Sequence, residues 1–306
     1  MLESRILFLS VAVLIFLPGA CTPAPDVGET EAEEPAVPAI LWEAAGGMDT
    51  PESAYVDRDT GFVFVSQIAG EPDGRDGNGR IVQLGSDGAV LSESWVTGLN
   101  APKGLRSHDG VLWTADIDEV IGIDIRTAEI VSRIAIGGAL FLNDVAVGGD
   151  GTVYVSDMAA TRIYAVRDGG YEVFAEGEEL EYPNGLLVDG GQLIVGGWGR
   201  PEADFTTVVP GRLFALDLET KEKTLITPDP FANIDGVESD GQGGYVITDY
   251  LAGKLMHVSA NGTVRDLGVF GPGTADLAFI ADRGVAIVPH MQENRVAAYD
   301  VSRFLR

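Results

Sequence analysis

Short strand-like stretches of alternating or continuous apolar residues fill the chain from Ile40 onward, and turns rich in Asp and Gly separate them. The segment 144–174 shows the pattern best, with strand-like stretches at 144–147, 152–157, 162–166 and 171–174. Runs of apolar and β-branched residues bounded by Gly and Asp are typical of β-strands. The pattern therefore predicts units of four short antiparallel strands.

Each unit opens with a similar triplet: a polar residue, then a small or acidic residue, then an apolar residue. The triplets start at Glu52, Lys103, Asn143, Asn184 and Asp235, and a sixth, Ala275-Asp276-Leu277, places its polar residue one position later. Their first residues are 51, 40, 41, 51 and 40 positions apart. A period of about 40–50 residues indicates an array of repeated supersecondary units. Six such units predict an all-β fold, a six-bladed β-propeller with four antiparallel strands per blade, over residues 39–306.

Two details refine this prediction. Ala39–Glu43 is expected to supply the outer strand of the last blade and so to close the ring. The two longer spacings fall in Gln67–Arg80 and Gly196–Arg212, each between the second and third strands of a blade. Because the strands of a meander alternate in direction, both insertions are expected on the face where the triplets begin, a common binding face. Free variation of surface loops is the alternative. The sequence shows neither a seventh triplet nor an internal linker, which disfavours seven blades or two domains.

The first 38 residues are predicted to lie outside the propeller. Residues 1–20 resemble a signal peptide of the lipoprotein type, whose apolar run Ile6–Leu17 is too short to span a bilayer. Cys21, the only cysteine, then corresponds to the lipidated residue, although Pro18 departs from the usual lipobox and leaves plain secretion as the alternative. Residues 21–38 are acidic and Pro-rich, as in an extended linker. We therefore expect an exported bacterial lipoprotein, anchored by its lipid to a membrane and facing the periplasm or the cell surface.

Charge and composition narrow the classes of function. The chain has 47 Asp and Glu against 20 Lys and Arg, a formal net charge of −27. Nucleic-acid binding requires concentrated Lys and Arg, so no nucleic-acid partner is expected. An acidic surface favours cations over anions. Three His and one Cys offer no cluster for Zn²⁺, and no glycine loop of the nucleotide-binding kind supports an organic cofactor.

The first residue of each triplet is expected to face the central channel. The channel would then gather Glu52, Lys103, Asn143, Asn184 and Asp235. Carboxylate and amide oxygens are the hard ligands that Ca²⁺ accepts, with water completing its shell. The set predicts a site for Ca²⁺ or another divalent cation. Asn-Gly and Asp-Gly are also ordinary turn sequences, so any single triplet is equally explained by a structural turn.

Three segments resemble motifs of the regucalcin/gluconolactonase-like family: Pro51-Glu52-Ser53-Ala54, Pro183-Asn184-Gly185-Leu186 and Ile234-Asp235-Gly236-Val237. The motifs are short, but the resemblance extends over nearly the whole propeller. It implies six blades around a divalent metal, often Ca²⁺, and hydrolysis of lactones; related propellers hydrolyse organophosphates. By position, Glu52, Asn184 and Asp235 correspond to metal ligands, and Asn143 to a further asparagine that contacts metal or substrate. Asp235 also corresponds to the catalytic base or nucleophile.

Four other residues are candidates for contact with a small-molecule substrate. Lys103 matches no family role; it would stabilise negative charge during catalysis, bind a substrate carboxylate, or weaken the metal by offsetting the carboxylates. His290 titrates near neutral pH, and Trp198 with Arg200 would hold a ring or an anionic group. A structural histidine and a packed rim tryptophan are the alternatives. The Asp residues that end second strands, such as Asp157, are expected to cap turns.

Two functions follow from these observations. The first is a divalent-metal-dependent hydrolase of a small lactone or related ester, exported and tethered to a membrane. The second is a non-catalytic propeller that serves as a platform for a protein or glycan partner. The metal-ligand set favours the first, and the lack of a nucleophile–His–acid set keeps the second open.

Overall fold

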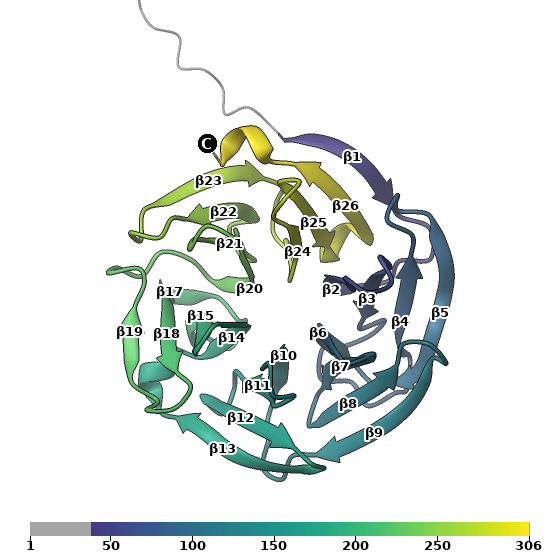
Figure 1. Ribbon diagram of the computed structural model, residues 1–306, viewed down its shortest axis with the longest axis horizontal. Helices are drawn as coiled ribbons and strands as arrows, with labels where there is room; N and C mark the ends of the chain where they lie inside the picture. The colour runs from purple at the N-terminus through teal and green to yellow at the C-terminus, as the bar shows by residue number, and fades with distance from the viewer. Residues whose placement is uncertain (1–37, 306) are drawn as a thin grey trace, which may run out of the picture. The chain divides into compact units, whose positions relative to one another are not determined.

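The computed structural model describes residues 38–305, so the predicted signal peptide, Cys21 and nearly all of the linker lie outside the described residues. Six four-stranded antiparallel sheets are arranged around a central axis (Figure 1). This confirms the all-β, six-bladed β-propeller. Within the described range the only helices are three 3-10 turns: η1 (Glu178–Leu180), η2 (Met291–Glu293) and η3 (Ser302–Phe304). No helix of residues 38–305 is long and apolar enough to cross a membrane.

The first three blades are uninterrupted meanders in which each strand pairs with the next. Blade one contains β2 (Pro51–Val56), β3 (Val63–Gln67), β4 (Gly79–Leu84) and β5 (Val90–Leu99). Blade two contains β6 (Pro102–His108), β7 (Val111–Asp116), β8 (Glu119–Asp124) and β9 (Glu129–Ala135). Blade three contains β10 (Leu142–Val147), β11 (Val153–Asp157), β12 (Arg162–Arg167) and β13 (Gly170–Glu176).

The second half differs by one inserted hairpin and by the closure of the ring. Blade four contains β14 (Pro183–Asp189), β15 (Gln192–Gly197), β18 (Leu213–Asp217) and β19 (Lys223–Leu225), with the hairpin β16 (Gly199–Pro201) and β17 (Thr207–Pro210) between its second and third strands. Blade five contains β20 (Ile234–Ser239), β21 (Tyr245–Asp249), β22 (Lys254–Val258) and β23 (Val264–Val269). Blade six contains β24 (Ala278–Ile280), β25 (Val285–His290), β26 (Arg295–Asp300) and β1 (Ala39–Ala44).

Strands from the two ends of the described chain close the ring. β1 pairs antiparallel with β26, which confirms the expected outer strand of the last blade (Figure 1). Next to the axis, Asp276 N donates to Glu52 O at 3.0 Å and Ala54 N donates to Asp276 O at 3.1 Å. The ring is thus closed by hydrogen bonds both at its outer edge, between β1 and β26, and next to the axis, between Asp276 and blade one.

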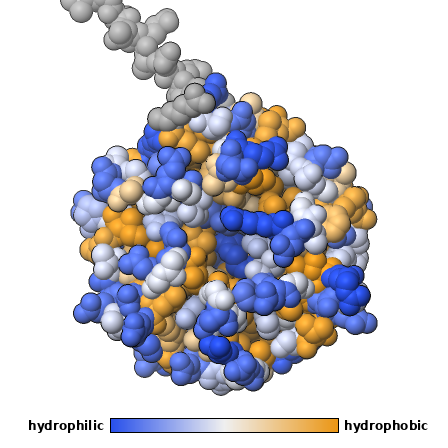
Figure 2. All heavy atoms as spheres, viewed as in Figure 1, coloured by the Kyte–Doolittle hydropathy of each residue, from blue (hydrophilic) through white to orange (hydrophobic). Residues whose placement is uncertain are grey.

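Apolar side chains fill the spaces between neighbouring blades. Every residue of β11 is buried, because a second strand is covered on both faces by adjacent blades. The cluster shared by blades three and four includes Ile163, Phe174, Leu186, Val195 and Phe214. The axis itself stays polar. Figure 2 shows that the face in view is hollowed at the centre of the ring, where hydrophilic side chains gather.

Three triplet glycines allow the inner strands to approach closely around the axis. A Cβ on Gly104 would lie 2.0 Å from Asp144 Oδ1, and one on Gly185 would lie 2.2 Å from Asp235 O. Gly236 is equally crowded by Asp276 Oδ1, at 2.5 Å. All three glycines lie inside strands, so the turn alternative for these Asn-Gly and Asp-Gly sequences does not apply. Glycine is required here because another backbone or carboxylate occupies the place of its side chain.

Candidate functional site

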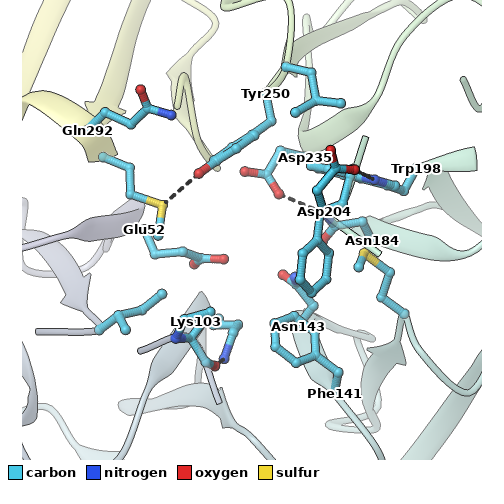
Figure 3. Close-up of a pocket in the computed structure, with 16 residues that line it drawn as sticks. Glu52, Lys103, Phe141, Asn143, Asn184, Trp198, Asp204, Asp235, Tyr250 and Gln292 are labelled. Carbon is cyan, nitrogen blue, oxygen red and sulfur yellow. Dashed lines mark hydrogen bonds between the residues drawn. The ribbon is translucent and has the colours of Figure 1, made fainter. Parts of the chain in front are cut away.

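The first residues of five triplets meet at one cavity of about 330 Å³ at the mouth of the channel (Figure 3). The five are Glu52, Lys103, Asn143, Asn184 and Asp235, from the starts of β2, β6, β10, β14 and β20. Both insertions also reach this cavity, since Pro72 of blade one and Asp204 and Phe205 of blade four line it. The insertions therefore stand on the mouth face, as their position in the meander predicts.

Two buried oxygens at the mouth have no hydrogen-bond partner. Asn184 Nδ2 donates to Asp235 Oδ1 at 2.8 Å, and this leaves Asn184 Oδ1 without a donor. Glu52 Oε2 is likewise buried and without a partner among the described residues. An unsatisfied buried polar atom costs about 1–3 kcal/mol. Oxygens held in this way on one cavity are suited to a ligand that supplies positive charge.

Burial raises the pKa of the two carboxyl groups that begin triplets at the mouth, those of Glu52 and Asp235. Desolvation, with repulsion from Asp276 second, raises the pKa of Asp235 to about 8. The pKa of Glu52 is also raised well above its usual value, first by desolvation and then by the charges of Asp235 and Asp276. The Lys103 ammonium offsets only part of this effect on the pKa of Glu52. A divalent cation between the carboxylates would reverse the shift, because it stabilises their ionised forms.

The donor set fits a hard cation. Glu52 and Asp235 provide charge, and Asn143 and Asn184 provide amide oxygens, which together match the oxygen ligands of Ca²⁺. Among residues 38–305 there is no group of three or more His, Cys, Asp or Glu side chains that could hold a metal. A cation at this mouth would therefore rest on two carboxylates, amide oxygens and water.

Lys103 is almost fully buried and is engaged with backbone oxygens. Its Nζ donates to Ala101 O and to Pro72 O, both at 2.9 Å, and lies 4.6 Å from the centre of the Phe141 ring. Burial lowers the pKa of Lys103 to about 8, although the charge of Glu52 opposes the shift. Because Pro72 belongs to the blade-one insertion, Lys103 anchors that loop beside the cavity.

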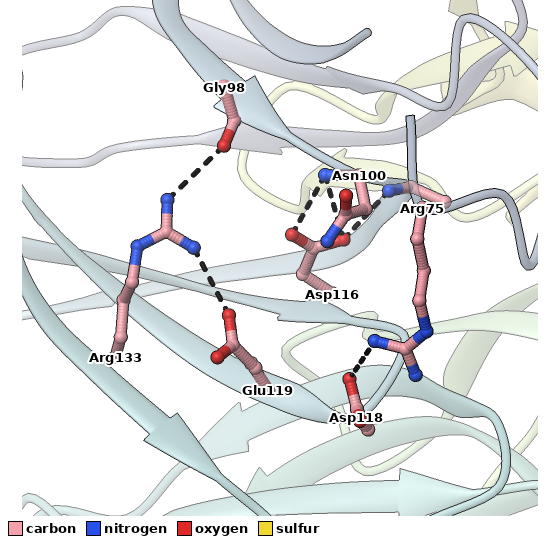
Figure 4. A network of polar contacts seen from close by, with 8 residues as sticks. Arg75, Gly98, Asn100, Asp116, Asp118, Glu119 and Arg133 are labelled. Atoms are coloured by element: carbon pink, nitrogen blue, oxygen red, sulfur yellow. Dashed lines mark hydrogen bonds and ion pairs between the residues drawn. The ribbon is translucent and has the colours of Figure 1, made fainter. Parts of the chain in front are cut away.

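A second cation anchors the same insertion from outside. Arg75 Nη1 pairs with Asp118 of blade two at 2.7 Å (Figure 4). In the same view, Asp116 accepts hydrogen bonds from the backbone N–H groups of Asn100 and Ala101. Asp157 caps backbone N–H groups in the same manner, and this is the turn-capping role expected from the sequence.

Of the remaining predicted contact residues, only one lies at the cavity. Trp198 lines the cavity, and its Nε1 donates to Phe205 O at 3.1 Å. Arg200 is exposed and is not among the lining residues. His290 also lies outside the lining: it shares a 2.8 Å hydrogen bond with the Tyr299 hydroxyl and packs edge-on against Phe270. Burial lowers the pKa of His290 to about 4.

Sequence reasoning missed an apolar ring at the mouth. The residue directly after each second strand forms this ring, which we call the collar: Ile68, Ile117, Met158, Trp198, Tyr250 and Met291. All of them except Ile117 line the cavity. Of the six, only Trp198 was predicted from the sequence; in blades two and three the residue just before, Asp116 or Asp157, turns back to cap the backbone. The available signal was an apolar residue immediately after the buried strand in all six blades.

A buried ion pair crosses the channel farther along the inner strands. Arg106 lies three residues after Lys103, about 10 Å along an extended strand. Its Nη1 lies 3.1 Å from Glu238 Oε1, and its Nη2 donates to Val237 O at 3.3 Å. β6 and β20 belong to opposite blades (Figure 1). Burial raises the pKa of Glu238 to about 7 against the opposing charge of Arg106.

Comparison with known proteins shows the fold. No protein-family model matches the sequence, and no curated protein matches it. A catalytically inactive virginiamycin B lyase from Staphylococcus aureus, solved with quinupristin, is 13% identical, with a TM-score of 0.57 over 84% of this chain and 97% of that one. A streptogramin B lyase is 12% identical, with a TM-score of 0.57 and coverages of 84% and 95%.

A chain from the structure of a protein complex is also similar. The structure of a nidogen/laminin complex contains a chain that is 14% identical, with a TM-score of 0.63 over 74% of this chain and 88% of that one. These likenesses establish the propeller architecture alone. A shared fold does not by itself assign a function.

Proposed function

We propose that this propeller is a Ca²⁺-dependent hydrolase, or one dependent on another divalent cation, that acts on a small lactone or related ester. The pair of partnerless oxygens, Glu52 Oε2 and Asn184 Oδ1, on the same cavity as Asp235 is the observation that carries this proposal. The resemblance of three triplets to the regucalcin/gluconolactonase-like family supports the same chemistry.

Glu52, Asn143, Asn184 and Asp235 would hold the cation. When bound, the cation would polarise the substrate carbonyl and stabilise the oxyanion that forms on it. The Asn184 amide orients Asp235 by donating to Oδ1, and this hydrogen bond offsets part of the rise in the pKa of Asp235 that burial and Asp276 cause. Asp235 Oδ2 then accepts the proton of an attacking water. Direct attack by Asp235 on the electrophile is the alternative.

Lys103 serves in this scheme as a positioning residue that also carries charge. Two of its N–H groups hold the insertion at Pro72 and the backbone at Ala101. Its positive charge at the cavity wall favours the carboxylate that ester hydrolysis produces. Asn143 and Trp198 are placed to contact the substrate, since both line the cavity.

Thermal unfolding in chelator and then in excess Ca²⁺ tests the metal. A ligand that binds only the folded protein raises the midpoint by mass action, and we expect Glu52→Gln to abolish the rise. His290→Gln is the control, because His290 does not line the cavity. A midpoint that is unmoved by Ca²⁺, Mg²⁺, Mn²⁺ and Zn²⁺ would remove the basis of the hydrolase proposal.

A panel of lactones, aryl esters and phosphotriesters tests the reaction. We expect Asp235→Asn to abolish turnover. If this variant still binds Ca²⁺, the loss identifies Asp235 as the base or nucleophile rather than only a ligand. Turnover that persists in Asp235→Asn would assign the chemistry to another group.

A non-catalytic platform for a protein or glycan is the second candidate. The hairpin β16–β17 exposes Val208 by 82% and Val209 by 56% beside the mouth, and exposed apolar groups of this kind often contact partners. A metal-independent interaction that is lost in Val208→Ser, together with no turnover of any substrate, would favour this candidate.

Export and attachment to a membrane through Cys21 complete the proposal. Lipid at Cys21 would place the propeller at the periplasmic or cell-surface side. Cys21→Ser is expected to move the protein from the membrane fraction to the soluble fraction. Equal membrane association of both forms would exclude the lipid as the anchor.

A further inference from the structure

We propose that the mouth selects a substrate with an extended apolar substituent next to the scissile carbonyl, rather than a polyhydroxylated one. This inference rests on the proposed hydrolase function and names its substrate class. It depends on the side chains around the four proposed metal ligands. These surrounding side chains are mostly apolar, whereas the ligands themselves are polar.

The collar surrounds the oxygens with apolar surface. Five of its six side chains line the cavity, and each comes from a different blade: Ile68, Met158, Trp198, Tyr250 and Met291. Recurrence at one structural position makes this surface a property of the whole ring rather than of one loop. A ligand whose carbonyl lies at the axis therefore meets apolar contacts on nearly every side.

The apolar surface continues outward on the side of blades three and four. Phe141 and Phe205 both line the cavity, and their ring centres are 6.1 Å apart. Phe205 is 46% exposed, and Leu140, next to Phe141, is 62% exposed. Figure 3 shows Phe141 and Trp198 on the same side of the cavity, with Glu52 on the other. An apolar group attached to a carbonyl at the axis can leave the cavity along the surface that Phe141 and Phe205 form together.

Buried polar contacts hold this wall in place before any ligand arrives. Asn233 Nδ2 donates to Trp198 O at 2.7 Å and to Thr207 Oγ1 at 2.8 Å. Trp198 Nε1 in turn holds Phe205 O. Preorganised apolar surface loses little conformational entropy when a ligand binds. The exposure of Phe205 is therefore built into the hairpin and is not the result of a loose loop.

The polar side chains at the cavity have few hydrogen bonds left for sugar hydroxyls. Lys103 is engaged with two carbonyl groups. Asp204 Oδ1 accepts from Thr206 N and Thr206 Oγ1, and the Tyr250 hydroxyl is directed at Met291 Sδ. A site that recognises hydroxyl groups needs free, placed partners for them. Beyond the four proposed metal ligands, the other polar groups on the lining are Gln292, which hydrogen-bonds to Tyr250, and Asp204 Oδ2.

Binding of stable lactams separates substrate class from catalysis. γ-Lactams with an ethyl or an octyl substituent, and a polyhydroxylated sugar lactam, would be titrated calorimetrically into the Ca²⁺-loaded protein. We expect the octyl probe to bind at least tenfold more tightly than the ethyl probe, since burial of a few additional CH₂ groups is sufficient for this. The sugar lactam is expected to bind most weakly.

Phe205→Ser is expected to reduce the octyl-to-ethyl affinity ratio at least threefold. Leu91→Ser is the matched control, because Leu91 is also half-exposed but lies on the outer strand β5, away from the cavity. Both replaced side chains are half-exposed, so both variants should unfold at nearly the midpoint of the unmodified protein. Equal reductions in Phe205→Ser and Leu91→Ser would contradict a role for the wall.

The outcomes also distinguish this inference from the function on which it rests. A sugar lactam that binds best, or a ratio near one, would overturn the apolar class even if lactones are hydrolysed. Chain-length-dependent, Phe205-dependent binding without turnover of any ester would sustain the apolar class and end the hydrolase proposal.

Discussion

The carboxylates Glu52 and Asp235 at the mouth of the channel and the ion pair Arg106–Glu238 deeper in it differ in whether a buried charge has a partner of opposite charge. Among residues 38–305, Glu52 and Asp235 at the mouth have no cationic partner within salt-bridge distance, and Glu52 Oε2 has no hydrogen-bond donor. About three residues deeper, Arg106 and Glu238 satisfy one another across the axis at 3.1 Å. Isolated buried charges are costly, whereas paired ones are tolerated. The deeper pair is therefore part of the scaffold, and the mouth is arranged for a ligand.

The largest expected effect breaks the deeper level. Arg106→Met leaves Glu238 buried without its counter-charge, and we expect a loss of about 3–5 kcal/mol in the free energy of unfolding. Denaturant titration measures it. Arg106→Met combined with Glu238→Leu should recover only part of the loss, because the charge of Arg106 also stabilises the buried carboxylates of Asp144 and Asp276. If the single variant unfolds like the unmodified protein, the pair is not a structural element.

The next effect concerns the mouth. Ca²⁺ at about 100 times its dissociation constant should add about 2.7 kcal/mol to the free energy of unfolding. In Glu52→Gln this gain should vanish, while the metal-free variant should be more stable than the metal-free parent, since a carboxylate repelled by Asp235 and Asp276 is gone. Chemical denaturation with chelator and with Ca²⁺ gives both values. If Glu52→Gln is less stable than the parent protein when both are free of metal, the Glu52 carboxylate stabilises the empty mouth, and the mouth does not differ from the deeper ion pair in this respect.

Lys103→Met is expected to have smaller effects, on Ca²⁺ affinity at the mouth and on the order of the blade-one insertion. Loss of the positive charge should tighten Ca²⁺ binding by about 1 kcal/mol, or roughly fivefold. Loss of the hydrogen bond to Pro72 should speed proteolysis within Gly70–Gly77. Calorimetry and limited proteolysis measure these changes. Tighter binding at unchanged turnover would exclude a catalytic role for Lys103.

The effect that is smallest at neutral pH, and that develops only in acid, tests a buried group outside the mouth. The folded-state pKa of His290, about 4, is lowered by burial and by Arg295. A lowered histidine pKa means that His290 contributes stability above its ordinary pKa of 6.5, and that this stability is lost as the pH falls from there toward 4. His290→Gln should flatten the stability profile in this range by at most about 1.4 kcal/mol per pH unit. If the free energy of unfolding depends on pH in the same way in His290→Gln and in the unmodified protein, another group causes the loss of stability in acid.

The sequence predicts the fold and the membership of the mouth because both depend on repetition. Equivalent triplets recur with a fixed period, so Glu52, Asn143, Asn184 and Asp235 can be placed on one axis before any coordinates exist. Apart from Trp198, the collar was missed by one position, since the alternation of a strand does not indicate where the chain leaves the sheet. Met158 and Tyr250 face the cavity because the preceding Asp turns back to the loop.

The repeat pattern of the sequence does not predict contacts between distant blades. Arg106 and Glu238 are 132 positions apart, and nothing local indicates that they meet across the axis. The role of Lys103 depends on where the insertion folds back, which places Pro72 O within reach of Nζ. Pairings of this kind are set by the three-dimensional arrangement of blades, not by the period.

The pairing of β1 with β26 has a consequence for biogenesis. A ribosome makes the outermost strand of blade six first and the three strands beside it last. The sheet that completes the ring therefore cannot assemble before nearly the whole polypeptide has been synthesised. The last blade is therefore expected to form later than the five blades whose four strands are consecutive in the sequence or interrupted only by one hairpin.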